Sequence, residues 1–331
     1  MNLHDIEKLF RHFGEITALV IGDAMVDTYF WGKVERVSPE APIPIVSVTH
    51  KESRLGGAAN VSLNLQALGA TPLLFAVTGE DDKGRRFRKL MEKNNLSSDG
   101  IFSDPERMTT VKSRIISDGR HIVRIDEESN GFINAELEQR IFRAIGHTLE
   151  ERKIDVIIFV DYDKGMITPS LFEKVLVLAR EKGIFVSVDP KKRNFSQYHH
   201  VDLFKPNFKE FVEGTQLPVI KGDLDSLKKA AEAYKKEKSF GYIFITLSEL
   251  GVFISNGIDR NYYPAVIRYI ADVSGAGDTV LAVASLCLAA RTHPETMALL
   301  SNIAGGLVCE QVGVVPIDRE RLKKEMEKGN F

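Results

Sequence analysis

The 331-residue sequence lacks most features that would set it apart from an ordinary globular protein. Its two cysteines, Cys287 and Cys309, lie in apolar helical stretches, which favours small buried core residues over a disulfide or metal ligands. A net charge of -2 provides no overall field for nucleic acid or a membrane. No apolar run approaches a membrane span, and the N-terminus lacks the unbroken apolar core of a signal peptide. These absences predict a cytoplasmic protein with no nucleic-acid or membrane partner.

Several common catalytic motifs are also missing. The sequence has no Walker P-loop, no GxSxG nucleophile elbow and no zinc-ligand spacing among its eight histidines. It has no GxGxxG followed by an acidic residue, which disfavours a dinucleotide-binding protein. The single tryptophan, Trp31, either packs within a small sheet or stacks on a sugar face.

What the chain does contain is an alternation of short apolar runs with helical patterns. Strands are expected at 17–23, 73–77, 153–160, 184–188, 202–205, 242–246 and 251–255. Helices are expected after Gly56-Gly57 and at 83–94, 169–182, 223–238, 276–290 and 295–311. This order predicts an α/β fold whose mostly parallel sheet is covered by helices on both faces.

Two segments, at about 29–54 and 109–127, break this rhythm because they alternate polar and apolar residues without helices between them. The second contains a hairpin signal, in which TTVKSRIIS and HIVRIDEE flank Asp118-Gly119. We interpret both segments as one small sheet that forms a lid on a single domain spanning 1–331. Its edge and apolar face would need covering, which predicts a homodimer through the lid.

The stretch DVSGAGDT carries the first chemical signal. Gly275, Ala276 and Gly277 lead into an apolar helix, and such a turn leaves backbone N–H groups free to bind an anion. Asp278 follows in the first helical turn. It either caps the helix, which the spacing alone favours, or accepts a proton from an attacking hydroxyl beside a transferring phosphate.

A second acidic feature is NFKE, which follows a short strand. Asn207 and Glu210 have the spacing of a capping box at a helix start. Alternatively, they organise water around Mg²⁺, an ion that takes few protein ligands and keeps several waters.

Two further features are candidates for sugar binding. Asp23 and Asp27 follow the first strand, at the edge where open α/β sheets bind ligands, and paired carboxylates suit the hydroxyls of a polyol. Gly56-Gly57 permits close backbone approach, with Asn60 in the helical turn beside it. The plainer alternatives are a solvated loop end and a turn entering a core helix.

Five motifs follow one another over about residues 17 to 316: a strand ending in GD, then GGAAN, N-x-x-E, T-x-S/G-x-x-G and GAGD. Their order resembles that of the ribokinase or PfkB carbohydrate kinase family. The resemblance implies a ribokinase-like three-layer sandwich that uses ATP and Mg²⁺. Stretches such as SPEAPIPIV, VDYDKG, SVDPKK and KPNFKEF are similar to heptose-phosphate kinases. Those kinases convert D-glycero-D-manno-heptose 7-phosphate to the 1,7-bisphosphate on the way to lipopolysaccharide. Since the chain ends soon after the kinase motifs, it resembles their stand-alone form.

The resemblance also implies a role for each motif. Asp278 would be the general base, with the N–H groups of Gly275, Ala276 and Gly277 as an anion hole. Residues implied to hold the sugar are Asp23, Asp27, Gly56, Gly57 and Asn60. Residues implied to lie along the nucleotide phosphates or to organise Mg²⁺ are Asn207, Glu210, Thr246, Ser248 and Gly251. A monovalent cation, with K⁺ as the candidate, would be held by Asp272, Ser274 and carbonyls near Gly313.

An acceptor that already carries phosphate needs a cationic contact. The candidates, each of which could instead be a solvated side chain, are Lys112, Arg114, Arg124, Lys164 and Lys191. The sequence departs from the family pattern at Asp163, which replaces a glycine, and at Ser248, where many members have glycine.

Two other functions stay open. The chain could be another PfkB-family kinase that acts on ribose, fructose or a hexose phosphate. It could also be a catalytically silent sugar-binding regulator, although the retained Asp278 argues against that.

Overall fold

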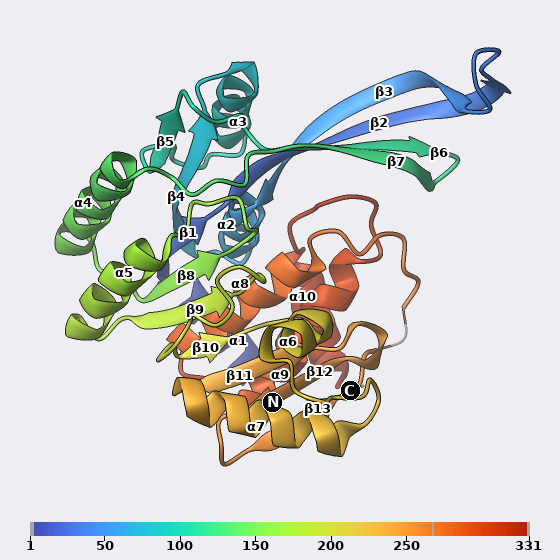
Figure 1. The fold of residues 1–331 in the computed structure, drawn as a ribbon. Coiled ribbons are helices and arrows are strands. Elements are labelled where there is room, and N and C mark those ends of the chain that lie inside the picture. Colours follow the sequence, from blue (N-terminus) through green and yellow to red (C-terminus); the bar gives the residue numbers. More distant parts are fainter. Residues whose placement is uncertain (1–2, 267, 330–331) are drawn as a thin grey trace.

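The computed structural model describes residues 3–266 and 268–329, and it confirms the predicted α/β class. Its main sheet has nine strands (Figure 1). In spatial order they are β13 (Arg260–Tyr263), β12 (Val252–Ser255), β11 (Tyr242–Thr246), β10 (Leu203–Phe204), β9 (Phe185–Asp189), β8 (Val156–Val160), β1 (Thr17–Gly22), β4 (Thr71–Gly79) and β5 (Ile101–Asp104). All neighbours from β11 to β5 pair in parallel, and β12 and β13 extend the sheet antiparallel.

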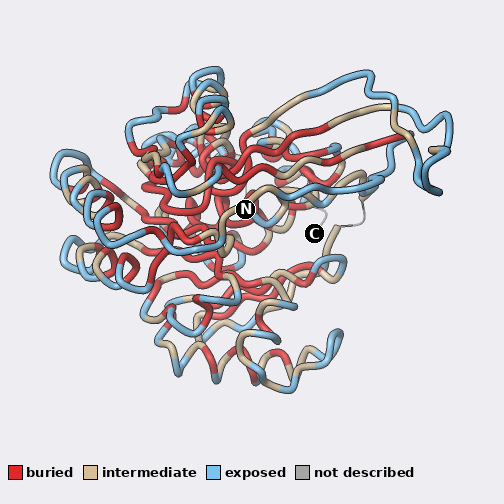
Figure 2. The backbone as a smooth tube through the Cα atoms, turned by 45° about the horizontal axis from the view of Figure 1, so that its top comes forward, coloured by how far each residue is buried: buried red, intermediate tan, exposed pale blue. Residues whose placement is uncertain are grey.

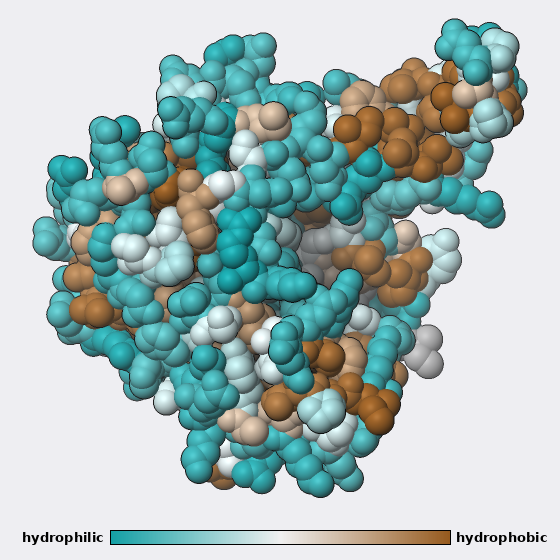
Figure 3. Space-filling view, viewed as in Figure 1, coloured by the Kyte–Doolittle hydropathy of each residue, from teal (hydrophilic) through white to brown (hydrophobic). Residues whose placement is uncertain are grey.

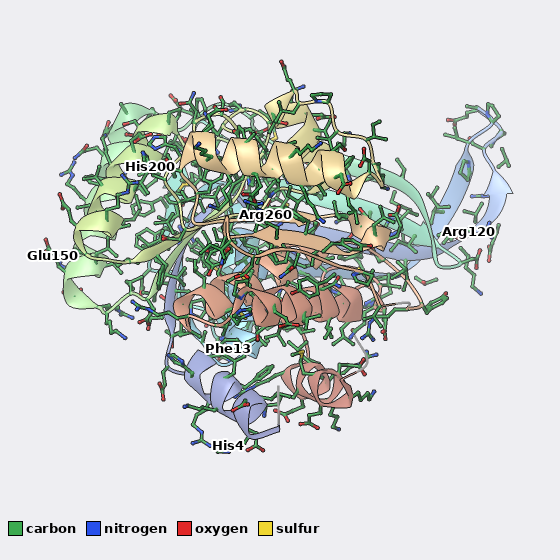
Figure 4. All side chains as sticks on the ribbon, turned by 90° about the horizontal axis from the view of Figure 1, so that it is seen from below. His4, Phe13, Arg120, Glu150, His200 and Arg260 are labelled. Atoms are coloured by element: carbon green, nitrogen blue, oxygen red, sulfur yellow. The ribbon has the colours of Figure 1, made fainter. Side chains whose placement is uncertain are left out.

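Helices cover both faces of this sheet. One face packs against α1 (Leu3–Phe13), α2 (Ala58–Ala67), α3 (Asp82–Lys93), α8 (Ala276–Ala289), α9 (Pro294–Val308) and α10 (Arg319–Lys328). The other packs against α4 (Ala135–Glu151), α5 (Pro169–Glu181), α6 (Phe208–Thr215) and α7 (Leu224–Lys238). In Figure 4 the sheet lies between the yellow helix α7 and the red helix α9.

Burial on both faces explains the unbroken apolar strands of the sequence. In β1, Ala18 and Val20 belong to the core on one face, while Leu19 and Ile21 belong to the core on the other. The two cysteines are free and buried, as predicted. None of the helices that the structure describes is long and apolar enough to span a membrane.

Some elements are missing from the sequence prediction. Helix α4 had clear signals, because Asn134 caps it by accepting from the Leu137 N–H at 2.9 Å and its buried side chains recur at helical spacing. The edge strands β5 and β13 have four residues each, which is too few for a periodic pattern to be distinctive. Helix α10 was also not predicted. It is strongly charged, whereas apolar periodicity is the main sequence signal for a helix.

A second sheet joins the two irregular segments into an arm that projects from the domain (Figure 1). Its strands are β3 (Pro44–Gly57), β2 (Ala24–Val37), β6 (Val111–Ser117) and β7 (Arg120–Glu127), in that spatial order. The central pair, β2 and β6, is parallel, so the sheet needs both segments. Strand β2 is buried where it leaves the core and exposed at its far end (Figure 2). We call this four-stranded sheet the lid.

The two faces of the lid differ in character. On one face, Tyr29 accepts a hydrogen bond from the Val314 N–H at 2.8 Å, and Arg54 donates to the Val312 carbonyl at 3.0 Å. This polar face therefore contacts the loop that follows α9. The strand register places apolar side chains on the other face, and apolar groups gather on the arm in Figure 3. That face includes Val123 and Ile125, which are 47% and 50% exposed.

The loop that follows β8 makes one very close backbone approach, which generates the first prediction. Gly165 has φ +89°, and a Cβ there would lie 1.9 Å from the Gly131 carbonyl oxygen. We expect Gly165→Ala to lower the free energy of unfolding by about 2 kcal/mol or more, since it adds a clash to a left-handed backbone. Denaturant titration measures this change.

The matched control is Gly146→Ala in the interior of α4, where a Cβ would meet nothing within 4 Å. That change should raise the free energy of unfolding by up to about 1 kcal/mol because alanine favours helix. Equal effects of the two substitutions would contradict the strain assigned to Gly165.

Candidate active site

Asp278, in the first turn of α8, is the centre of the site. Its Oδ2 accepts a hydrogen bond from the Asn60 amide at 2.8 Å, and its Oδ1 accepts one from the Tyr162 hydroxyl at 2.6 Å. The side chain is buried, with 3% of its surface exposed. Both oxygens are thus bound by side chains from other elements, and no side chain in the described part of the chain caps α8. The alternative in which Asp278 merely caps its helix is wrong.

The surroundings of Asp278 favour proton acceptance. Burial raises the pKa of Asp278 to about 6, against the hydrogen bonds from Asn60 and Tyr162, which lower it. The negative charge of Asp189 raises this pKa further, and the positive charge of Lys205 lowers it. A carboxylate with a pKa in this range is ionised at neutral pH and still basic enough to take a proton.

A buried network fixes the orientation of the Asn60 amide. The Asn64 amide donates to Asn60 Oδ1 at 3.3 Å, and Asn64 Oδ1 in turn accepts from the Thr279 hydroxyl at 3.0 Å and from the Ile317 N–H at 3.0 Å. With its oxygen engaged, Asn60 presents its NH₂ group to Asp278. The predicted contact of Asn60 with a sugar stays a prediction, and the structure shows it as a partner of Asp278.

Asp23 shapes the loop that carries Tyr162. Its carboxylate accepts the backbone N–H groups of Tyr162 at 2.8 Å, Lys164 at 3.0 Å and Met166 at 3.0 Å. Burial raises the pKa of Asp23, and these three hydrogen bonds oppose that shift. Because both oxygens have protein donors, Asp23 organises residues 161–166, and its predicted role as a sugar ligand stays a prediction.

The same loop explains the departure from the family pattern at Asp163. Asp163 has φ +58°, a left-handed conformation that favours glycine. Aspartate is among the non-glycine residues that tolerate this region best, so the loop keeps its shape without the glycine.

Asp27, at the base of the lid, pairs with Arg114 rather than standing free. Both side chains are buried, and the Arg114 guanidinium donates to Asp27 Oδ1. Burial raises the pKa of Asp27, although the charge of Arg114 lowers it. A Cβ at Gly56 would lie 1.9 Å from Asp27 Oδ2, so glycine there makes room for this carboxylate. A predicted sugar ligand and a predicted phosphate ligand therefore bind each other.

Asn207 and Glu210 form the predicted capping box at the start of α6. The Glu210 N–H donates to Asn207 Oδ1 and the Asn207 N–H donates to Glu210 Oε2, each at 2.8 Å. Lys191 donates to Glu210 Oε1, and its ammonium lies 5.3 Å from the centre of the Tyr162 ring. The capping-box alternative is confirmed, while a role around Mg²⁺ stays a prediction.

Asp189 and Lys205 form a buried ion pair that sequence reasoning missed. Lys205 Nζ lies 3.0 Å from Asp189 Oδ2, and it would be 3.9 Å from a Cβ on Gly277, so it lies beneath the glycine turn. Asp189 Oδ1 is buried without a hydrogen-bond partner in the described part of the chain. Asp189 is the last residue of β9 and Lys205 directly follows β10, while Tyr162 lies two residues after β8, and this position at the ends of apolar strands was the available signal.

The remaining predicted ligands divide into two groups. Thr246, at the end of β11, bridges to Asn207, and Ser248 and Gly251 belong to the turn that follows (η1, Ser248–Leu250). These residues therefore lie together beside α6. By contrast, Arg124 lies on the lid with 57% of its side chain exposed and pairs with its neighbour Asp126.

The predicted cation site brings its residues together. Asp272 Oδ1 accepts from the Ser274 N–H, and Oδ2 accepts from the Gly313 N–H, each at 2.9 Å. The Ala276 N–H in the predicted anion hole donates to the Val273 carbonyl at 3.3 Å. Within residues 3–266 and 268–329, no three His, Cys, Asp or Glu side chains are grouped as metal ligands.

Trp31 lies on the lid, in an aromatic stack. Its ring centre is 5.5 Å from that of Tyr29 and 5.2 Å from that of His50. This arrangement agrees with the alternative in which Trp31 packs within the small sheet.

The fold is similar to those of solved sugar kinases. The phosphofructokinase-2 of Escherichia coli, in its crystal structure with potassium, gives a TM-score of 0.78 at 15% identity, covering 95% of this chain and 98% of that one. The ribokinase of Thermotoga maritima gives a TM-score of 0.69 at 18% identity, covering 94% and 99%. At such identities the likeness shows the fold alone, and it confirms the ribokinase-like architecture.

Sequence relatives lead further. The bifunctional protein HldE of Pelobacter propionicus is 38% identical over 314 residues, which cover 95% of this chain and 64% of that protein. That of Geobacter metallireducens is 39% identical over 316 residues, covering 95% and 63%. The chain therefore spans a little under two thirds of the length of these relatives. Residues 16–320 also match the family model described as pfkB family carbohydrate kinase. The chain therefore belongs to the pfkB family of carbohydrate kinases.

Proposed function

We propose that this sugar kinase uses ATP to phosphorylate D-glycero-D-manno-heptose 7-phosphate at its anomeric hydroxyl, giving the 1,7-bisphosphate that leads to ADP-heptose and lipopolysaccharide. The observation that carries the chemistry is the buried Asp278 carboxylate at the start of α8, held by Asn60 and Tyr162. The choice of acceptor rests on the likeness to bifunctional protein HldE. An enzyme that consumes ATP and a sugar phosphate would work in the cytoplasm.

In this mechanism, Asp278 accepts the hydroxyl proton as the sugar oxygen attacks the γ-phosphorus of ATP. The bond from that phosphorus to the β-phosphate oxygen breaks, and ADP leaves. The N–H groups around Gly277 at the start of α8 offset the charge that spreads over the transferring phosphoryl group. Lys205 lies beneath the same turn and adds positive charge there. Tyr162 and Asn60 hold the base in place, so little reorganisation accompanies the transfer.

Residues beside this turn suit Mg²⁺, which the family is expected to use. Glu210 and Asn207 would hold it through water, next to Asp189, whose Oδ1 has no partner in the described part of the chain. When bound, Mg²⁺ neutralises charge on the nucleotide phosphates. The Asp272 site would take a monovalent cation, with K⁺ as the candidate, near the same helix start.

A panel of acceptors tests the proposed function. A coupled assay of ATP consumption would compare heptose 7-phosphate with free heptose, ribose, fructose and fructose 6-phosphate. We expect kcat/KM to be highest for heptose 7-phosphate, by about tenfold or more, because a site built for a charged group rejects acceptors that lack it. A higher kcat/KM on any unphosphorylated sugar would refute the assignment.

Asp278→Asn is the catalytic control for this panel. The variant should keep ATP binding and lose about 10²-fold or more in turnover, because the amide cannot accept the proton. Normal turnover would remove Asp278 from its role. ATP consumption that no sugar stimulates in the wild type would favour a sugar-binding regulator instead.

The pH dependence of kcat/KM gives a further prediction. Asp278 must be ionised to act, so activity should fall as the pH drops through its pKa of about 6. Tyr162→Phe removes a hydrogen bond that lowers this pKa, so the acid limb should move to higher pH by up to about one unit. Steady-state kinetics over a pH range of about 5 to 8 would measure this shift of the acid limb.

Burial also raises the pKa of Asp161 to about 6, so the Tyr162 variant is needed to assign the limb to Asp278. Tyr234→Phe is the control, since its hydroxyl faces the Phe195 carbonyl, 3.4 Å away in the core. If kcat/KM depended on pH in the same way in the wild type and in Tyr162→Phe, the acid limb would not report the ionisation of Asp278.

We also propose that the chain forms a homodimer through the lid. The lid is an open sheet whose outer strands, β3 and β7, each pair with one strand only among the described residues, and its outer face exposes apolar groups. Side chains of the polar face, such as Asp27 and Tyr29, already make contacts within the chain. A second copy has the same apolar lid face, so the two faces would pack against each other about a twofold axis.

Light scattering after size exclusion tests this dimer. We expect a dimer for the wild type and a shift to monomer for Ile125→Lys, which places a charge in the apolar face. Ile258→Lys is the matched control, because Ile258 is 90% exposed on the turn between β12 and β13 and should leave the dimer intact. A monomeric wild type at assay concentration would refute the proposal.

A further inference from the structure

One carboxylate, that of Glu128, holds two lysine side chains from different parts of the fold. Its Oε2 lies 3.3 Å from Lys112 Nζ on strand β6 of the lid, and its Oε1 lies 2.9 Å from Lys164 Nζ on the loop after β8. Each lysine side chain is 14% exposed, and that of Glu128 is 21% exposed. The three side chains thus form a partly buried cluster between the lid and the core.

This cluster lies close to the catalytic aspartate. The backbone N–H groups of Lys164 and Tyr162 share the Asp23 carboxylate, and the Tyr162 hydroxyl reaches Asp278. In the register of the lid, Lys112 is opposite Asp27 and therefore on its polar face. A sugar with its reacting hydroxyl at Asp278 would extend from there along this polar surface.

The other predicted phosphate ligands are engaged elsewhere. Arg114 is tied to Asp27 in a buried pair, Lys191 is bound to Glu210 at the nucleotide side, and Arg124 is largely exposed. Separating the buried pair would leave an uncompensated buried charge, which is costly. Lys112 and Lys164 differ in that both ammonium groups converge on one carboxylate, that of Glu128. Lys112 also pairs with Asp126 at 3.0 Å, and Lys164 also donates to Asn130 Oδ1 at 3.0 Å.

Glu128 has the chemistry of a replaceable anion. Burial disfavours its charge, but the hydrogen bond from Lys164 and the charge of Lys112 hold its pKa below the usual range, so it is ionised. A phosphate group carries more charge and three acceptor oxygens, and it can satisfy two ammonium groups at once. Glu128 belongs to the segment just after β7, outside both the sheet and α4, so regular backbone pairing does not restrain it.

We propose that the phosphate group of the acceptor binds between Lys112 and Lys164, in the place that the Glu128 carboxylate takes in this structure. The inference rests on the proposed function and deepens it by naming the phosphate subsite. Since Lys112 belongs to the lid and Lys164 to the core, a phosphate held by both would tie the lid to the core. An unphosphorylated sugar leaves Glu128 in its place and forms no such tie.

Inorganic phosphate is the direct probe, titrated calorimetrically into the protein whose nucleotide site is filled by a non-hydrolysable ATP analogue. We expect Lys112→Met and Lys164→Met each to weaken phosphate binding about tenfold or more, since each removes a charged hydrogen bond. Glu128→Gln should tighten it several-fold, because the competing charge is gone while the shape is kept. In the acceptor assay, each lysine variant should lower the ratio of kcat/KM for heptose 7-phosphate over free heptose about tenfold.

The matched controls are Lys83→Met and Glu127→Gln. Lys83 and Glu127 also form a lid–core ion pair, but the register places Glu127 opposite Val111, on the apolar face of the lid. Both variants should bind phosphate as the wild type does. Thermal unfolding checks that every variant is folded. The isosteric Glu128→Gln tests the subsite by a variant that keeps both lysines.

Two results would overturn the subsite. One is lysine variants that bind phosphate as tightly as the controls, and the other is no phosphate binding by either the wild type or Glu128→Gln. The outcome is separable from that of the acceptor panel. If phosphate binding depends on both lysines while heptose 7-phosphate is a poor acceptor, the subsite stands and only the named sugar is wrong.

Discussion

Most of the site depends on one buried carboxylate, Asp23, and the three backbone N–H groups that it accepts. By gathering alternate residues of the loop 161–166 around itself, it fixes where their side chains point. Tyr162 is thereby directed to Asp278, and Lys164 is directed to the base of the lid. One charge buried beside the end of β1 thus positions both Tyr162 and Lys164, the side chains to which the proposals assign the two ends of the acceptor. The cost of burying that charge is offset by hydrogen bonds within the protein.

Much of the fold could be predicted because its strands are buried on both faces and its helices carry caps. Strand β11 and helix α5, for example, were expected within a residue of where they lie. The lid was harder, since alternation predicts strands but not partners. Strands β2 and β6 pair in parallel although β3, two helices and two core strands separate them along the chain. Such non-local pairing leaves no mark in either segment alone.

The site was predictable in its composition but not in its internal bonding. Motif order identified Asp278, Asn60 and Asp23, but it did not predict that Asn60 would donate to Asp278 or that Asp23 would accept from the loop 161–166. Spacing shows which polar groups arrive at a sheet edge, but buried groups must also satisfy one another, and that accounting needs coordinates. Tyr162 and Lys205 were missed for the same reason, because each matters through a partner distant in sequence.

The parallel pairing at the centre of the lid has a consequence for synthesis of the chain. Strands β2 and β3 leave the ribosome as a long hairpin whose inner edge has no partner until β6 follows, more than fifty residues after β3. During that interval an unpaired edge and an apolar face are exposed together, the combination that promotes association with other nascent chains. Polar and charged residues along the hairpin, such as Lys33, Glu35 and Lys51, would oppose such association in a folding intermediate as well as in the finished enzyme.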